Sequence, residues 1–208
     1  GWASYNNYGL IGGLRGASQM ISYEVAMGLS IVGILMVYQS VRLDEIVRAQ
    51  GALLGGLLPK WGIFVQPVAF IIFLAAVVAE NKRTPFDLPE GESEIVGYFV
   101  EYSSMKWAMF YLGEFIEIAL ASALITTLFF GGWQIPYVTP DPDNGLLVFL
   151  QFITFILKTA FFCWFMLLMR WTFPRFRYDQ LMWLGWKVML PIALANIFVT
   201  GVILLWLH

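Results

Sequence analysis

Five apolar stretches of membrane-spanning length organise this chain. They fall at roughly 20–38, 62–80, 104–130, 146–169 and 181–207, and the first has a helical extension back to about Tyr8. A helix needs about 20 mostly apolar residues to cross the hydrocarbon core of a bilayer. The pattern therefore predicts an all-α, polytopic transmembrane helical bundle with about five spans and an acidic loop between spans two and three. The connections are short, so we expect 1–208 to form a single transmembrane domain.

The composition excludes several classes of protein. The 208 residues are 60% hydrophobic and only 12% charged, whereas soluble domains carry about 25% charged residues. The net charge of −2 differs in sign from the basic surface of a nucleic-acid binder. We therefore expect neither a soluble enzyme domain nor a disordered chain nor a nucleic-acid partner. Cys163 and His208 are the single cysteine and histidine, so no Cys/His metal site is expected.

Basic residues are distributed unevenly between the two sets of loops. The set containing loops 81–103 and 170–180 carries eight of them, and the other set carries three. The eight are Arg15, Lys82, Arg83, Lys106, Arg170, Arg175, Arg177 and Lys187, and the three are Arg42, Arg48 and Lys60. Because cytoplasmic loops are enriched in Lys and Arg, we expect the first set on the cytoplasmic or matrix side and the C-terminus opposite. Segment 41–52 is either a short interfacial helix or a solvated connection.

Acidic residues are concentrated where a membrane protein usually has few. Eight of the fourteen lie between 80 and 117, namely Glu80, Asp87, Glu90, Glu92, Glu94, Glu101, Glu114 and Glu117. Glu114 and Glu117 fall inside the third span, and Glu24 falls inside the first. An ionisable group at the bilayer centre costs about 2.5–3.5 kcal/mol on insertion scales, so it normally faces the protein interior or a wet cavity.

Glu114 and Glu117 are three residues apart and share one helix face. Two buried carboxyl groups side by side are suited to taking up and releasing protons, because each disfavours the charged form of the other. We interpret the pair as a proton-handling site. The alternative is a pair of salt-bridged packing acids, with Lys106, Lys158 or Arg15 as candidate partners.

Three further segments carry weaker signals. A polar stripe on the first span is either a channel wall or a seam against another helix; it consists of Arg15, Ser18, Gln19 and Ser22. Loop 81–103 contains too many apolar residues to lie free in water, which favours a packed loop that roofs a polar cavity or a docking face for another protein. Loop 170–180 mixes Arg with aromatic residues, which is typical of a membrane-interface anchor or a partner-binding segment.

Four sequence blocks, in this order, resemble the H subunit of NADH-quinone oxidoreductase, the respiratory complex I. They are GWASYNNYGLIGGLRGASQMISYEV, AENKRTPFDLPEGESEIVGYFVEYSSMKWAMFYLGEF, LFFGGW and FPRFRYDQLMWLGWKVMLP. The resemblance covers nearly the whole chain. Members of that family are longer at the N-terminus, so the resemblance implies the C-terminal part of such a protein, without the first helices of the quinone entrance.

The resemblance implies a role at the junction of the two arms of the complex. In that family, the membrane protein encloses the quinone-reduction chamber together with the iron–sulfur-carrying and 49-kDa-type subunits of the soluble arm. It also adjoins small and antiporter-like membrane subunits, and it couples quinone chemistry to proton translocation. The implied location is a bacterial inner membrane or mitochondrial inner membrane. Quinone is the implied substrate, whereas the iron–sulfur clusters and FMN lie on partner subunits, so this chain is expected to be a non-redox subunit.

Matching the family motifs assigns the proton-pathway residues one by one. The SYE acid falls on Glu24, the PFDLPE-x-E-x-E acids on Asp87, Glu90, Glu92 and Glu94, the EYS acid on Glu101, and the acid of the third span on Glu114. The family pattern has no acid at the position of Glu117, which joins the set only because it lies three residues from Glu114. Supporting charges are Arg15, Arg83, Lys106 and Lys158. Two alternatives stay open: a related membrane component of an energy-converting hydrogenase, and a structural anchor for the soluble arm. An independent transporter would need matched broken helices, which the chain does not show.

Overall fold

A computed structural model describes residues 1–54, 58–91, 97–99, 101–138 and 145–207. Its longer helices are α1 (Asn7–Tyr38), α5 (Met105–Phe129), α6 (Gly145–Thr172) and α8 (Leu190–Leu207). Shorter ones are η1 (Trp2–Ser4), α2 (Leu43–Gln50), α3 (Gly62–Val65), α4 (Pro67–Glu80), α7 (Tyr178–Trp183) and the π-helical η2 (Leu184–Met189). The two-residue strands β1 (Leu53–Leu54) and β2 (Leu58–Pro59) form a small antiparallel pair.

Four helices are long and apolar enough to cross a membrane. They are Asn7–Tyr38, Met105–Phe129, Gly145–Thr172 and the continuous segment Tyr178–Trp206 that joins α7, η2 and α8. The expected span at 62–80 is shorter and broken, because α3 and α4 are separated at Gln66. The residue before a proline is disfavoured in the α conformation, and Pro67 starts the new helix. The prediction of an all-α polytopic bundle is confirmed.

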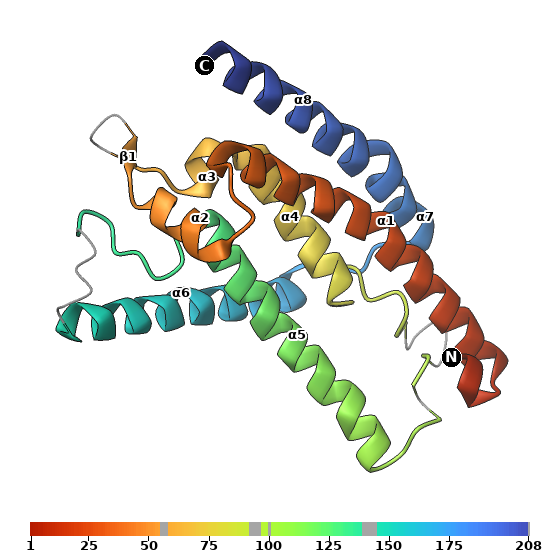
Figure 1. The fold of residues 1–208 in the computed structure, drawn as a ribbon. Coiled ribbons are helices and arrows are strands. Elements are labelled where there is room, and N and C mark those ends of the chain that lie inside the picture. Colours follow the sequence, from red (N-terminus) through yellow and green to blue (C-terminus); the bar gives the residue numbers. More distant parts are fainter. Residues whose placement is uncertain (55–57, 92–96, 100, 139–144, 208) are drawn as a thin grey trace.

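The core of the bundle is formed by α1, α4 and α8. Figure 1 shows α8 running alongside α1, with α4 against them, and all three pairs are in contact. Tyr23 and Ile34 of α1 and Phe73 of α4 are almost fully buried. The Phe73 ring also packs against Phe129 at the end of α5, with ring centroids 5.4 Å apart. This packing fixes one end of α5 against α4.

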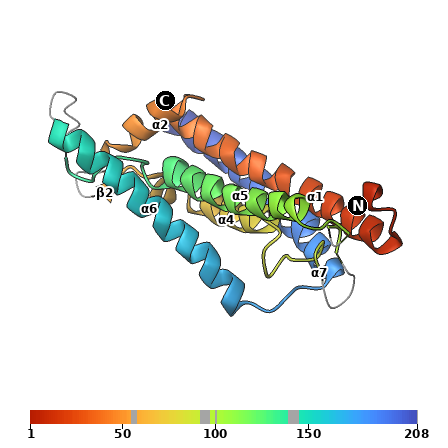
Figure 2. The same ribbon diagram turned by 90° about the horizontal axis from the view of Figure 1, so that it is seen from below.

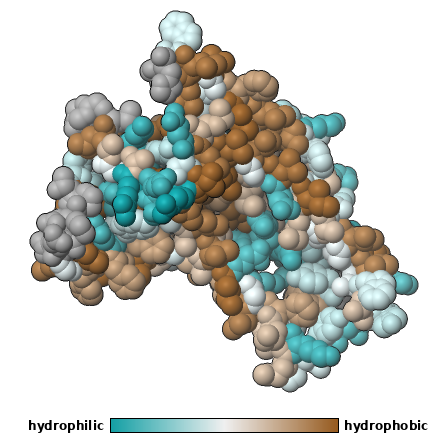
Figure 3. Space-filling model, viewed as in Figure 1, coloured by the Kyte–Doolittle hydropathy of each residue, from teal (hydrophilic) through white to brown (hydrophobic). Residues whose placement is uncertain are grey.

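Helix α6 crosses the other helices at an angle and contacts mainly α5 (Figure 2). Among its described side chains only Phe162 and Met166 are buried, and the Phe162 ring lies 4.8 Å from Phe130. The rest of its apolar surface faces outward. In Figure 3 brown, hydrophobic side chains cover much of the visible face, with a teal patch at the left over α2. Such extensive exposed apolar surface requires lipid or other membrane subunits around it.

Segment 41–52 contains a helix, α2, over residues 43–50. Ile46, Val47 and Gln50 are buried, and the Gln50 amide holds the C-terminal end of α5. Its Nε2 donates to the carbonyl oxygens of residues 127 and 128, at 3.1 and 3.0 Å, and its Oε1 accepts from the Gly131 N–H at 2.7 Å.

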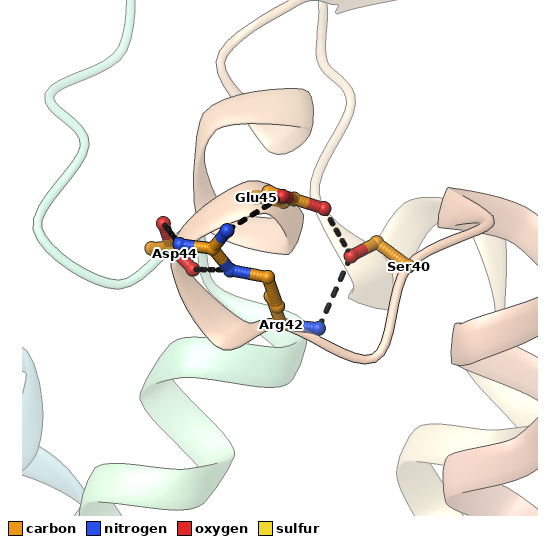
Figure 4. A network of polar contacts seen from close by, with 4 residues as sticks. All are labelled: Ser40, Arg42, Asp44 and Glu45. Atoms are coloured by element: carbon orange, nitrogen blue, oxygen red, sulfur yellow. Dashed lines mark hydrogen bonds and ion pairs between the residues drawn. The ribbon is translucent and has the colours of Figure 1, made fainter.

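The N-terminal end of α2 carries an exposed polar network (Figure 4). The Arg42 guanidinium lies 3.1 Å from Asp44 and 3.4 Å from Glu45. The Ser40 hydroxyl accepts from the Arg42 N–H at 3.1 Å and donates to Glu45 at 2.5 Å. Exposed ion pairs of this kind contribute about 0–1 kcal/mol. The network therefore orders the start of α2 without adding much stability.

Candidate functional site

Residues 85–89 of loop 81–103 are packed against α1. Pro85, Phe86, Leu88 and Pro89 are buried. The loop approaches α1 closely at Gly12, where an added Cβ would lie 3.0 Å from the Pro89 carbonyl oxygen. Only glycine accepts so close a backbone approach without movement. The expectation of a packed loop is confirmed for these residues, and the freely solvated alternative is wrong for them.

Gln19 of α1 ties the end of α4 to this loop. Its side chain is fully buried, and Nε2 donates to the carbonyl oxygens of Ala79 (2.7 Å) and Phe86 (2.9 Å). Ser22, one turn further along α1, accepts from the Trp186 indole N–H at 2.8 Å. The polar stripe on the first span is therefore a packing seam at these two residues.

Residues 175 and 176 of loop 170–180 pack against residues 85–87 of loop 81–103. Arg175 and Asp87 form an ion pair of 2.8 Å, and the Phe176 N–H donates to the Pro85 carbonyl oxygen at 3.1 Å. The Phe86 and Phe176 rings pack with centroids 5.5 Å apart. Burial raises the pKa of Asp87 above its usual value, and the Arg175 guanidinium opposes that shift. Loops 81–91 and 173–177 thus form one packed unit beside α1.

Arg83 and Glu114 connect this unit to α5. Their side chains form an ion pair of 3.3 Å, and each is only 11% exposed. The Arg83 guanidinium also lies 5.5 Å from the centre of the Phe115 ring. Glu90 lies beside Glu114. Burial, followed by the hydrogen bond to Glu114 and the charges of Glu114 and Asp87, raises the pKa of Glu90 to about 8, although Arg83 opposes the shift.

The acids continue along α5 toward α4 and α1. Glu117 lies within electrostatic range of Glu114 and Lys82, and Glu80 lies within range of Glu117, Glu24 and Lys82. Lys82 also lies over the Tyr98 ring, 5.2 Å from its centre. In Figure 3 a second teal area covers the C-terminal end of α4. We call this set of carboxyl groups the acid series; it consists of Asp87, Glu90, Glu114, Glu117, Glu80 and Glu24.

The other predicted residues lie outside the acid series. Glu101 accepts a hydrogen bond from Asn6 Nδ2 at 2.7 Å, and Lys106 is exposed. Arg15 lies 5.9 Å from the centre of the Tyr178 ring. Lys158 donates to the carbonyl oxygens of residues 130, 132 and 134 at 2.8, 3.1 and 2.9 Å, where α5 ends. Glu92 and Glu94 lie outside the described residues.

Sequence reasoning missed one pairing within the site and two of its contributors. The ion-pair partner of Glu114 is Arg83, not Lys106, Lys158 or Arg15. Glu80 joins the acid series although it was not selected as a site residue. A signal for it existed, since Glu80 ends an apolar span directly before the acidic loop 81–103. Arg175 could not be found from spacing, because 88 positions separate it from Asp87.

The arrangement can respond to a charge added nearby. Among the described residues, no group of three His, Cys, Asp or Glu side chains is placed to hold a metal ion. Two arginines and one lysine lie beside the acid series, so a proton or charge added at one carboxyl group changes the field at the next. Such effects are several times larger in a protein interior than in water.

Comparison with known proteins identifies the family. A sequence profile described as NADH dehydrogenase matches residues 1–201. The chain is 48% identical to one H subunit of the NADH-quinone oxidoreductase of Geobacter sulfurreducens, over 99% of this chain and 57% of that protein. It is 50% identical to the H subunit of Bacillus cytotoxicus, over 98% of this chain and 57% of that protein. The H subunit of Bdellovibrio bacteriovorus is 45% identical over 98% of this chain and 60% of its own length.

The chain spans a little under two thirds of the length of these relatives. The match extends over nearly all of its own residues and includes the loop and helices that carry the acid series. The resemblance found in the four sequence blocks is confirmed: the chain belongs to the NADH dehydrogenase family of membrane proteins, among the H subunits of NADH-quinone oxidoreductase.

Proposed function

We propose that this chain forms part of a complex I membrane subunit that walls the quinone-reduction chamber and couples quinone chemistry to proton translocation. The observation that carries the proposal is the acid series, which leads from a packed loop through α5 to α4 and α1. Its loop end would face the chamber, and its other end lies within the transmembrane bundle. Apolar and aromatic helix surfaces suit the long tail of a quinone.

Arg83 is the residue through which the coupling would act. It pairs with Glu114 and also acts electrostatically on Glu90. Reduction of a quinone consumes two electrons and two protons, so it creates a proton demand in the chamber. A negative charge formed at the loop end would draw Arg83 away from Glu114. Glu114 would then take up a proton, and Glu117 and Glu80 would sense the change.

Other subunits of the complex would surround this chain. Electron carriers, the iron–sulfur clusters and FMN, would lie on partner subunits, and the subunits carrying the terminal cluster and the 49-kDa-type chain would cover loops 81–103 and 170–180. These loops would lie on the cytoplasmic or matrix side, as their basic residues favour. Small and antiporter-like membrane subunits would cover the exposed apolar faces.

A structural anchor is the competing function, and two observations favour it. The ion pairs Arg83–Glu114 and Arg175–Asp87 hold the two loops and α5 together. If these contacts served only to attach the soluble arm, neutralising an acid would reduce the amount of complex but not its turnover.

The test compares Glu114→Gln with Glu45→Gln, a matched change in the exposed network at α2. NADH oxidation is measured in membranes with equal complex content, first with a soluble artificial electron acceptor and then with quinone. We expect Glu114→Gln to keep the first activity and to lower the second about tenfold, which corresponds to about 1.4 kcal/mol of barrier. Glu45→Gln should change neither. A Glu114→Gln variant that lowers the complex content but keeps both activities per complex would support the anchor instead.

A further inference from the structure

A cavity of about 440 Å³ lies among α1, the α3–α4 break and α8, away from the acid series. Its size falls within the range of ligand sites, roughly 300–1,000 Å³. Most of its wall is apolar and aliphatic. The lining residues include Val37 of α1, Val65 of α3, and Val199, Ile203 and Leu204 of α8. Nothing in the proposed quinone or proton chemistry uses it.

Polar groups enter the cavity at its inner part. Gln66, at the break between α3 and α4, donates from Nε2 to Thr200 Oγ1 at 2.6 Å. Its Oε1 accepts from Asn196 Nδ2 at 2.8 Å. All three residues line the cavity. This group lies level with Gly33 of α1, where an added Cβ would be 3.0 Å from Gln66 Oε1.

A lysine lines the outer part of the same cavity. Lys60 precedes α3, and both of its backbone polar groups form hydrogen bonds. Its N–H donates to the Ala52 carbonyl oxygen at 2.7 Å, and its carbonyl oxygen accepts from the Tyr38 hydroxyl at 2.8 Å. The Lys60 ammonium lies 6.0 Å from the centre of the Tyr38 ring. Among the described residues, no carboxylate forms an ion pair with it.

The relative depth of these groups follows from the packing of α1 and α8. Gly33 of α1 is close to Asn196, and Met36 is close to Gly201, so Tyr38 and Lys60 lie near the C-terminal end of α8. Between Asn196 and Leu204 the helix rises about 12 Å, at roughly 1.5 Å per residue. The cavity therefore runs from a cation at one end of the bundle to amide groups deeper among the spans.

We propose that this cavity binds one anionic membrane phospholipid. The phosphate pairs with the Lys60 ammonium, and an acyl chain lies along the valine and isoleucine side chains of α3 and α8. A lysine ammonium at the end of a membrane bundle, with no carboxylate partner among the described residues, attracts a negatively charged head group. A neutral quinone offers no charge to that lysine, and a free phosphate ion offers no apolar chain to the aliphatic wall.

The experiment measures lipids that stay bound to the purified, assembled complex after exchange into mild detergent. Mass spectrometry compares the parent complex with Lys60→Gln and with Arg48→Gln, a control that removes an exposed cation of α2 outside the cavity. We expect Lys60→Gln to lower the retained phosphatidylglycerol or cardiolipin at this site about tenfold, as loss of a charged hydrogen bond does. Arg48→Gln and retained phosphatidylethanolamine should be unchanged.

Two further variants keep the proposal testable if Lys60→Gln does not assemble. Lys60→Arg keeps the charge and should retain the lipid, whereas Val199→Trp fills the wall of the cavity and should displace it. A photoreactive residue placed at Ile203 should cross-link to a phospholipid. Equal lipid retention in Lys60→Gln and Arg48→Gln, or in Val199→Trp and the parent, would overturn the proposal. A cross-link from Ile203 to quinone or to a partner protein would also overturn it.

Discussion

Arg83 and Glu114 form an ion pair of 3.3 Å in which each side chain is only 11% exposed. Arg83 follows the end of α4, and Glu114 lies about one third of the way along α5, so the pair bridges two helices that otherwise contact each other mainly near the far end of α5. It is also the point at which the loop acids meet the transmembrane acids. The same ion pair therefore holds the loop to α5 and is the contact through which we propose that charge is sensed.

Replacing Arg83 by Met should reduce the amount of assembled complex. Removing one partner of a buried ion pair costs about 3–5 kcal/mol, because the other charge stays buried without compensation. The double variant Arg83→Met/Glu114→Met removes both charges and should recover much of the assembly while quinone-linked activity stays low. Native gel electrophoresis of membranes measures the complex content. A double variant that assembles no better than Arg83→Met would show that the pair is not the cause.

The loop around Glu90 should loosen as the pH rises. Its pKa is raised in the folded chain from 4.5 to about 8. The neutral Glu90 carboxyl group therefore stabilises the packed loop fully below pH 4.5. This stabilisation is lost as the pH rises through about 8. Hydrogen exchange of the amides of 85–91, corrected for intrinsic rate, should accelerate across this interval. Glu90→Gln should remove the acceleration, whereas Glu45→Gln should retain it. The same pH response in Glu90→Gln as in the parent would rule out this group.

Asp87 and Arg175, whose ion pair joins the two loops, should have coupled effects on turnover. Asp87→Asn and Arg175→Gln each break the 2.8 Å ion pair, so each should lower quinone-linked turnover, and the double variant should be no worse than the poorer single variant. Residues in direct contact show interaction energies of about 0.5–3 kcal/mol in such cycles. The readout is quinone-linked turnover per assembled complex. Strictly additive losses would mean that the two side chains act through different partners.

Lys158 should matter for assembly rather than for turnover. Its ammonium donates three hydrogen bonds to carbonyl oxygens just beyond α5, and an unsatisfied buried polar group costs about 1–3 kcal/mol. Lys158→Met should therefore lower complex content while turnover per remaining complex is kept. Lys187→Met, at an exposed lysine, serves as the control. Normal content with reduced turnover would instead assign Lys158 to the charge-coupling machinery.

Much of this fold is predictable because a membrane helix is encoded locally in the sequence. Runs of apolar residues indicate the spans to within a few residues, and Glu114 and Glu117 are recognisable because a charge inside such a run is costly. The break at Gln66 is not part of the sequence prediction, although Pro67 marks it. Helix α2 stays undecided from sequence because its eight residues form too short a segment for hydrophobic periodicity to settle.

The partners of the acids are not predictable, because they depend on how distant segments pack. The three lysine or arginine candidates for Glu114 follow from their place in the sequence, yet the side chain that reaches it is Arg83, on a folded-back loop. That loop is positioned by Gln19 and by the close approach at Gly12, which are contacts between segments more than sixty residues apart. Spacing within one helix contains no such information.

If the carboxyl groups pass charge from the loop into the bundle, their removal should change the number of protons translocated per electron. The complex is reconstituted into vesicles, and proton uptake is measured against NADH oxidation by quinone for Glu117→Gln, Glu80→Gln and the control Glu45→Gln. We predict fewer protons per electron in the first two variants and an unchanged ratio in the third. An unchanged ratio in all three, with normal assembly, would contradict the account and leave only a scaffold.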